Sequence, residues 1–282
     1  MPEIELSAIL IPALLFIGLG LLAGLLLTIF AKVFAVKTDE RVEKIVAALP
    51  GLNCGACGYS GCEGYAKSIV NEGAATNRCI PGGDAVSQKI SDVLGTEFED
   101  VTECTAFVAC NGKVPKATKD SYVYRGEPTC AACNMYYQGK GVCDFSCIGY
   151  GDCVKQCAYD ALSIIDEVAV VDPLRCTGCG MCTKACPKDL IHIRDAVKPV
   201  YVACSSCNNG KTTVKTCENG CIACGKCVKT CPNGAIYLKD NCAVIDYDKC
   251  TACMACVEVC PRHCINRVDC GAQSANAGCK SN

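Results

Sequence analysis

The sequence predicts an α+β protein in which a single N-terminal transmembrane helix is followed by a small cysteine-rich domain and two tandem repeats. Three observations predict this architecture. An uncharged apolar run lies near the N-terminus, cysteines recur at short spacings from Cys54 onward, and the cysteine pattern of the second half repeats itself. An apolar run of this length predicts a helix within a bilayer, and self-similarity at a fixed period predicts a repeated structural unit.

The apolar run extends from Leu6 to Ala31 without a charged residue. About 20 apolar residues suffice to cross the hydrocarbon core. The flanking charges are Glu3 and Glu5 before the run and Lys32, Lys37 and Arg41 after it. A secretory signal peptide begins with basic residues and has a shorter apolar core, so we expect an uncleaved anchor over residues 1–36. The basic flank predicts a single pass with everything that follows on the cytoplasmic side.

The cysteine content is unusually high. The 282 residues include 31 cysteines and no tryptophan. A cysteine content this high is typical of secreted disulfide scaffolds. That interpretation predicts a cleaved signal peptide and cysteines that are not clustered at metal-ligand spacing. Neither expectation fits this chain.

Residues 37–100 predict a small cluster domain. A short amphipathic helix is expected between Asp39 and Pro50, with one apolar face formed by Val42, Ile45, Val46 and Leu49. The glycine-rich loop that follows carries four cysteines at C-x₂-C-x₄-C-x₁₆-C spacing: Cys54, Cys57, Cys62 and Cys79. Gly55, Gly58 and Gly61 let the backbone wrap closely around a metal centre. Four thiolates also suit zinc, so the spacing alone leaves zinc open.

The remainder of the chain is a duplication. A single constant shift, which moves Cys130 onto Cys204, also moves the other nine cysteines up to Cys186 onto cysteines up to Cys260, without a gap. We therefore expect a linker at 101–129, repeats at 130–203 and 204–265, and a polar tail at 266–282.

The spacing within each repeat indicates the chemistry. The stretches CTGCGMCTKACP and CTACMACVEVCP both read C-x₂-C-x₂-C-x₃-C-P. This is the bacterial ferredoxin run, in which three thiolates hold one 4Fe–4S cube and the fourth holds the cube of the partner motif. Zinc ribbons instead use paired C-x₂-C motifs. Each repeat is therefore predicted to be a ferredoxin-like unit with two clusters.

Cross-ligation predicts the ligand sets. In the second repeat the two sets are Cys221, Cys224, Cys227 with Cys260, and Cys250, Cys253, Cys256 with Cys231. In the first repeat, Cys176, Cys179 and Cys182 are expected to share a cube with Cys157. Its sister motif departs from the pattern, because Tyr150 stands at the position of Cys224. Cys143 is the nearest substitute, which gives the set Cys143, Cys147, Cys153 and Cys186.

Seven further cysteines leave a second interpretation open: Cys104, Cys110, Cys130, Cys133, Cys204, Cys207 and Cys217. They are either free buried thiols or ligands of additional clusters. We expect five clusters as the minimum. Together these would make the cytoplasmic part strongly anionic. Basic residues beside the motifs moderate this charge or form a docking face for an acidic partner: Lys184, Lys188, Lys226, Lys229 and Arg262.

No P-loop, credible nucleotide fingerprint or acid–base constellation accompanies these motifs. The two histidines, His192 and His263, are isolated. We therefore expect no catalytic residues, no nucleic-acid partner and no complete active site in this chain.

The anchor helix, the Cys54-to-Cys79 loop ending in CIPGG, the stretch CIGYGDCVKQC and the tandem repeats together resemble the B subunit of the Rnf complex. That complex is the ion-translocating ferredoxin:NAD oxidoreductase of bacterial cytoplasmic membranes. The resemblance covers essentially the whole chain and implies 4Fe–4S clusters in the N-terminal motif as well. It implies that the chain accepts electrons from reduced ferredoxin and passes them to flavin- and NAD-bearing partner subunits, which move sodium ions or protons.

Two hypotheses from other classes are distinguishable by experiment. A membrane-anchored iron–sulfur sensor would not copurify with multi-span membrane subunits and flavoproteins. A zinc-rich scaffold would be colourless and silent in electron paramagnetic resonance.

Overall fold

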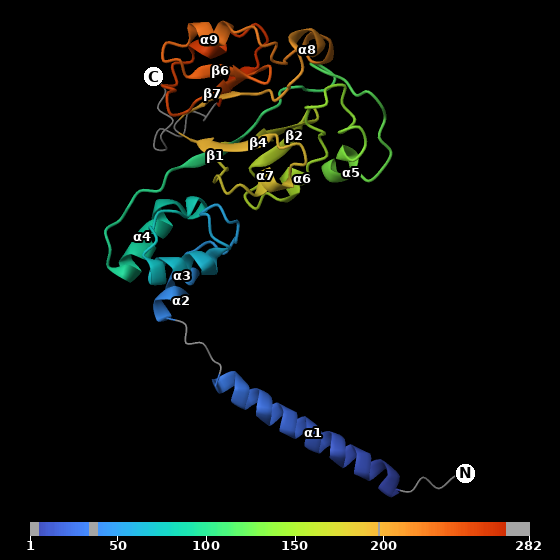
Figure 1. Cartoon of the computed structure of the whole chain (residues 1–282), viewed down its shortest axis with the longest axis vertical. Helices are drawn as coiled ribbons and strands as arrows, with labels where there is room; N and C mark the ends of the chain where they lie inside the picture. Colours follow the sequence, from blue (N-terminus) through green and yellow to red (C-terminus); the bar gives the residue numbers. More distant parts are fainter. Residues whose placement is uncertain (1–5, 34–38, 197, 269–282) are drawn as a thin grey trace, which may run out of the picture.

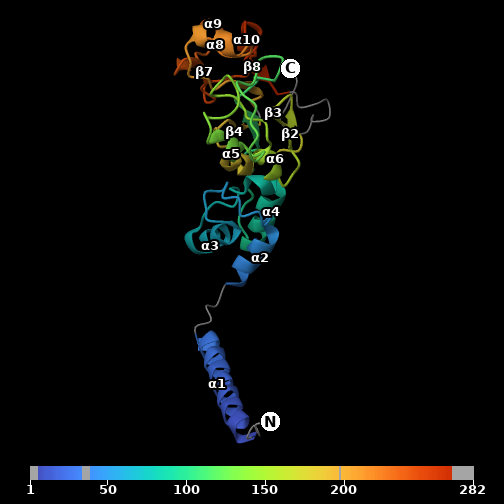
Figure 2. The same ribbon diagram turned by 90° about the vertical axis from the view of Figure 1, so that its right-hand side faces the viewer.

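The computed structural model describes residues 6–33, 39–196 and 198–268. The cluster domain, the first repeat and the second repeat follow one another in a row (Figures 1 and 2). Helices and short antiparallel strands alternate through both repeats, so the predicted α+β class is confirmed. The predicted tail from residue 269 onward lies outside the described residues, as do Glu3, Glu5 and Lys37.

Helix α1 (Leu6–Val33) contains the apolar run. Within it, Leu14–Lys32 has a mean hydropathy of 2.6, and none of this segment is buried by the rest of the chain. Among the described residues, this is the one helix long and apolar enough to cross a bilayer.

The cluster domain consists of α2 (Glu40–Ala48), α3 (Cys62–Glu72), the 3₁₀ turn η1 (Ile80–Gly82) and α4 (Gly83–Leu94). The side chain of Asp39 caps α2 by accepting a hydrogen bond from the Arg41 backbone N–H at 2.9 Å. Ile45, Tyr65 and Ile90 are almost completely buried where the three helices meet. The predicted helix and its apolar face are confirmed.

The first repeat contains two two-stranded antiparallel sheets, β1–β4 and β2–β3. Its elements are β1 (Cys104–Val108), α5 (Cys130–Asn134), α6 (Asp152–Lys155), β2 (Leu162–Ile165), β3 (Val168–Val171), α7 (Met181–Ala185) and β4 (Ile191–Asp195). Buried apolar residues from both sheets and their flanks, such as Leu162, Leu190 and Ile191, form its core among the cysteines.

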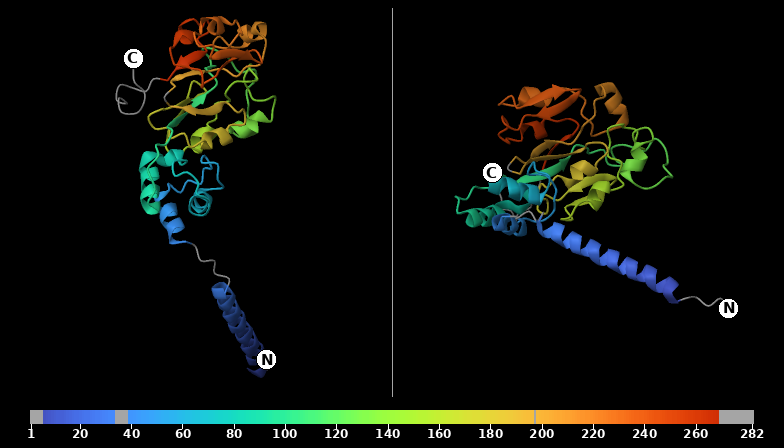
Figure 3. Two further views of the ribbon diagram at one scale, coloured as in Figure 1. Left: turned by 60° about the vertical axis from the view of Figure 1, so that its left-hand side comes forward. Right: turned by 60° about the horizontal axis from the view of Figure 1, so that its bottom comes forward.

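The second repeat has the same plan, with sheets β5–β8 and β6–β7. Its elements are β5 (Val200–Val202), α8 (Gly210–Thr216), α9 (Lys226–Thr230), β6 (Ile236–Lys239), β7 (Cys242–Ile245), α10 (Ala255–Glu258) and β8 (Ile265–Arg267). Its two cysteine motifs are separated by the hairpin β6–β7, in which Ile236 pairs with Ile245. The left view of Figure 3 shows the second repeat (orange and red) beyond the first (green and yellow).

The first strand of each repeat lies outside the boundaries predicted from the cysteines. The expected linker contains β1, which pairs with β4 from Cys104–Asp195 to Val108–Ile191. Strand β5 likewise precedes residue 204 but pairs with β8 of the second repeat. Cysteine spacing marks the metal motifs and carries no information on a strand that contributes to the sheet from a distance.

The two first strands also reveal an unequal spacing between the repeats. The elements from α6 to β4 recur as α9 to β8 at the constant shift that aligns the cysteine motifs. Val108 pairs with Ile191, and its counterpart Val202 pairs with Ile265. The shift from Val108 to Val202 is longer than the constant shift of the cysteine motifs. The extra residues of the first repeat therefore lie between Cys110 and Cys143, a stretch that includes Cys130. The match of Cys130 with Cys204 is a coincidence of register, because Cys110 is the structural counterpart of Cys204.

Candidate metal centres

The N-terminal loop brings its four predicted cysteines together. Gly55, Gly58 and Gly61 adopt φ values of +74°, +87° and +145°, so the backbone turns where a side chain would be strained. Burial, together with the thiolates of the other three cysteines of this loop, raises the pKa of Cys79 to about 11. A hydrogen bond of 2.9 Å from the Cys62 backbone N–H to the Asn53 side chain closes the loop onto α3.

In the first repeat, the predicted group of Cys157, Cys176, Cys179 and Cys182 is also brought together. Burial raises the pKa of Cys182 to about 11, and the thiolates of the other three cysteines add to the rise. The Cys176 sulfur accepts a hydrogen bond of 3.3 Å from the Ala106 backbone N–H of β1.

The sister group in this repeat differs from the sequence-based grouping. A cavity of about 370 Å³ is lined by four cysteines, which are Cys130, Cys147, Cys153 and Cys186. Burial raises the pKa of Cys153 to about 12, with further contributions from the thiolates of Cys147 and Cys130. Cys143 does not line this cavity. The reason is the insertion after β1, which contains α5 and brings Cys130 to this cavity. Cys130 there packs beside Tyr150, the residue that stands in place of a cysteine.

The second repeat forms two cavities with the expected crossing of the motifs. One, of about 330 Å³, is lined by Cys221, Cys224, Cys227 and Cys260, together with Cys264. The other, of about 340 Å³, is lined by Cys231, Cys250, Cys253 and Cys256. The fourth cysteine of each motif thus lies with the first three of the other.

Backbone N–H groups point at the cysteine sulfurs in a repeated manner. Ala161 donates to the Cys157 sulfur at 3.3 Å. Ala235, which occupies the corresponding position of the second repeat, donates to the Cys231 sulfur at the same distance. Hydrogen bonds to sulfur stabilise thiolates and tune the potentials of iron–sulfur centres.

The spacing of the thiols fits a cluster better than a single ion. Among the residues that the structure describes, no three His, Cys, Asp or Glu side chains converge closely enough for one metal ion. Zinc–sulfur bonds of about 2.3 Å would draw four thiolates to within about 4 Å of one another. A cube of four irons and four sulfides instead fills the space between four thiolates.

The sites adjoin one another along the row of domains. Lys184 of α7 donates a hydrogen bond of 2.7 Å to the Cys54 carbonyl of the N-terminal loop. Burial raises the pKa of Tyr159, and the thiolates of Cys179 and Cys54 add to this rise. The side chain of Tyr159 therefore lies near both sites. The thiolate of Cys182 contributes in the same way to the raised pKa of Cys153 in the next site.

The basic residues expected to moderate the cluster charge or to form a docking face are in part engaged within the chain. Besides Lys184, the Lys188 side chain donates to the Gln138 carbonyl at 2.6 Å, and the Arg262 side chain donates to the Cys217 carbonyl at 2.6 Å. These three cations therefore tie loops together beside the cysteines. Lys226 and Lys229 are exposed on α9.

Comparison with protein families supports iron–sulfur chemistry. Residues 49–81 match the family described as "Putative Fe-S cluster". Residues 146–190 and 220–264 each match a 4Fe-4S dicluster domain family, and a second family of that description matches 175–236. The two matches to the first dicluster family are related by the same constant shift as the cysteines, in agreement with the duplication.

Three relatives cover most of the chain. The B subunit of the Na⁺-translocating ferredoxin:NAD⁺ oxidoreductase complex of Acetobacterium woodii is 40% identical over 93% of this chain and 78% of its own length. The chain belongs to the family of Rnf B subunits. The B subunit of the ion-translocating oxidoreductase complex of Methanosarcina acetivorans is 38% identical over 72% of this chain and 77% of its own length. The proton-translocating relative of Clostridium ljungdahlii is 38% identical over 81% of both chains.

As a member of the Rnf B-subunit family, the chain is an iron–sulfur electron-transfer subunit of a multi-subunit oxidoreductase. Other subunits of that complex are its partners, and the family and the apolar helix α1 are those of a membrane-associated protein. The relatives differ in the ion that their names give, sodium in one and the proton in another.

Proposed function

We propose that this chain receives electrons from reduced ferredoxin and relays them toward flavin- and NAD-bearing partner subunits of the same membrane complex. The observation that carries the proposal is the adjacency of the cysteine sites, from the Cys54 loop through α7 into the first repeat. When bound, a 4Fe–4S cluster supplies one-electron transfer.

The ligand sets are proposed on the same geometry. The N-terminal set is Cys54, Cys57, Cys62 and Cys79; the sets of the first repeat are Cys157, Cys176, Cys179, Cys182 and Cys130, Cys147, Cys153, Cys186; those of the second repeat are Cys221, Cys224, Cys227, Cys260 and Cys231, Cys250, Cys253, Cys256. These residues hold at least five clusters. Their backbone N–H partners hold the thiolates in place while the packed core limits the access of water.

The chain is proposed to have no complete active site of its own and to act as a single-pass protein with its cluster domains in the cytoplasm. A hydride donor such as NADH needs a flavin to divide its two electrons between one-electron centres. The purified, flavin-free chain is therefore expected to be reduced by reduced ferredoxin or dithionite and to be inert toward NADH.

The test is anaerobic spectrophotometry of the purified chain with each donor in turn. Rapid bleaching by reduced ferredoxin, with no bleaching by NADH, is expected. Robust oxidation of NADH by the flavin-free chain would refute the proposal. Copurification from native membranes with multi-span subunits and flavoproteins distinguishes a relay subunit from a free-standing sensor.

A further inference from the structure

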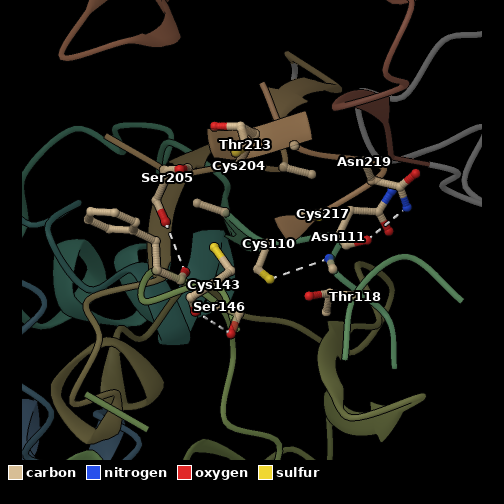
Figure 4. Close-up of a pocket in the computed structure, with 16 residues that line it drawn as sticks. Cys110, Asn111, Thr118, Cys143, Ser146, Cys204, Ser205, Thr213, Cys217 and Asn219 are labelled. Carbon is tan, nitrogen blue, oxygen red and sulfur yellow. Dashed lines mark hydrogen bonds between the residues drawn. The ribbon is translucent and has the colours of Figure 1, made fainter. Parts of the chain in front are cut away.

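A fourth cysteine-lined cavity lies where the two repeats meet. Its volume is about 360 Å³, and its cysteines are Cys110, Cys143, Cys204 and Cys217. Figure 4 shows these four side chains around one space, with polar residues such as Ser146 and Asn219 at its border. Two of the cysteines belong to the first repeat and two to the second.

The first pair, Cys110 and Cys204, occupies the same position in each repeat. Cys110 follows β1 and Cys204 follows β5, and an alanine precedes each of them. The N–H of that alanine donates a hydrogen bond of 2.7 Å to the carbonyl of the residue before the last strand of its repeat, which is Leu190 in the first and Cys264 in the second. The Cys110 sulfur accepts from the Cys147 N–H at 3.4 Å. The Cys204 sulfur accepts from the Cys221 N–H at 3.3 Å, which is the matching bond of the second repeat.

Cys143 and Cys217 form the second matching pair. The constant shift that aligns the cysteine motifs moves one onto the other, and each carbonyl accepts a backbone hydrogen bond from the residue three positions later, Ser146 or Gly220. One repeat alone thus presents two thiols. Only the packing of both repeats places four around one cavity.

Positive charge is supplied at equivalent positions as well. Lys188 follows the proline of the first repeat's motif, and Arg262 follows that of the second. The Lys188 side chain donates to the Asp144 carbonyl, and the Arg262 side chain donates to the Cys217 carbonyl at 2.6 Å. Two cations beside four thiols are suited to a centre with net negative charge.

Ordinary buried thiols are the competing interpretation. Burial raises the pKa of Cys110 to about 12 and that of Cys143 to about 11, as expected for neutral thiols in a packed interior. Free buried cysteines, however, have no reason to gather from four separate segments around one cavity. They also have no reason to accept N–H bonds repeated in both halves.

We propose that Cys110, Cys143, Cys204 and Cys217 bind a further 4Fe–4S cluster shared by the two repeats. This inference deepens the proposed relay: the role of the site in electron transfer rests on the proposed function, whereas the binding of a cluster does not. The shared site touches the neighbouring site of the first repeat through Cys147 and that of the second through Cys221. It therefore joins the clusters of the two repeats into one path.

Iron and sulfide content tests the inference directly. In the full-length chain produced anaerobically, six sites predict about 24 irons and about 24 sulfides per chain, whereas five predict about 20 of each. Cys217→Ser and Cys110→Ser are each expected to lose about four of both. Cys207→Ser is the matched control, because Cys207 is an exposed cysteine of the same segment that does not line the cavity, and it is expected to lose none.

Three results would overturn the inference. These are about 20 irons in the unmodified chain, an unchanged iron content in both variants, or one zinc per chain that disappears in Cys217→Ser. The count in the unmodified chain does not depend on whether a variant folds. A chain that contains the sixth cluster but is not reduced by ferredoxin would refute the proposed function and leave this site standing.

The position of the site predicts a second measurement. After rapid mixing with reduced ferredoxin, the electron paramagnetic resonance signals of the two repeats are expected to appear together in the unmodified chain. In Cys217→Ser, one repeat is expected to be reduced about tenfold later or more, because the link between the repeats is lost. Equal rates in both repeats of this variant would contradict the role of a shared link.

Discussion

The Lys184 ammonium group donates a hydrogen bond of 2.7 Å to the carbonyl oxygen of Cys54, which lies far earlier in the chain. Lys184 lies on α7, between Cys182 and Cys186 of the first repeat. The bond therefore connects the loop of one cysteine site with the motif of the next. Because it joins two cysteine-bearing segments directly, the contact also sets how the two sites face each other.

Lys184→Met is expected to loosen the cluster domain from the first repeat. A partly exposed bond from a charged donor is worth about 1 kcal/mol, which corresponds to about a fivefold larger open population. Hydrogen exchange at the amides of the Cys54 loop measures that opening. Lys229→Met, which changes the lysine at the same position of a motif in the second repeat, is the control. Equal exchange in the two variants would mean that Lys184 is only a surface charge.

The place of Cys130 can be tested by moving its thiol. Cys130→Ser is expected to lose about four irons, because one of four thiols around the cavity is removed. Adding Tyr150→Cys, which restores the cysteine found at Cys224 of the second repeat, is expected to recover them. Elemental analysis of the two chains makes the comparison.

Cys143→Ser provides the control for that exchange. It too is expected to lose about four irons, but Tyr150→Cys is not expected to recover them, because Cys143 lines a different cavity. Recovery of Cys143→Ser by Tyr150→Cys, without recovery of Cys130→Ser, would restore the grouping predicted from the sequence.

Cross-ligation in the second repeat predicts paired effects. Cys260→Ser is expected to disturb the centre of Cys221, Cys224 and Cys227, and Cys231→Ser the other centre of this repeat. Each variant is expected to lose about one cluster and to alter a different resonance signal. Because serine is nearly the size of cysteine, the loss reports ligation more than packing. Loss of the same signal in both variants would rule out the crossing.

Membrane topology predicts the location of the C-terminus. Lys32 follows the apolar segment of α1, and the positive-inside rule places the following residues in the cytoplasm. A reporter enzyme that is active only in the cytoplasm is expected to be active when it is fused after Asn282. Activity restricted to a periplasmic reporter would invert the proposed orientation.

Much of this architecture is predictable because the ligation of a cluster restricts the spacing of its cysteines in the sequence. The run from Cys250 to Cys260 indicates the ferredoxin motif and the crossing of its fourth cysteine, and the structure places Cys260 with Cys221, Cys224 and Cys227 along one cavity. The α2 helix is predictable for a different reason, since its cap at Asp39 and its apolar face are local signals.

The parts that were not predicted depend on distant packing. Sequence reasoning grouped Cys143 with Cys147, whereas the cavity takes Cys130, because nearness in sequence does not reveal that an insertion returns α5 to the site. The shared cavity was hidden because its two pairs follow different shifts between the repeats, longer for Cys110 and Cys204 than for Cys143 and Cys217. A signal was nevertheless present, since the strand ends FVAC at Cys110 and YVAC at Cys204 are nearly the same.

The division of the shared cavity between the repeats has a consequence for the order of biogenesis. Residues leave the ribosome from the N-terminus, and Cys110 and Cys143 are synthesised well before Cys204 and Cys217. The first repeat therefore emerges with its own two groups complete and half of this one exposed. At the shared site proposed above, a cluster would have to be inserted after Cys217 has appeared, so the joint between the repeats would mature later than either group of the first repeat.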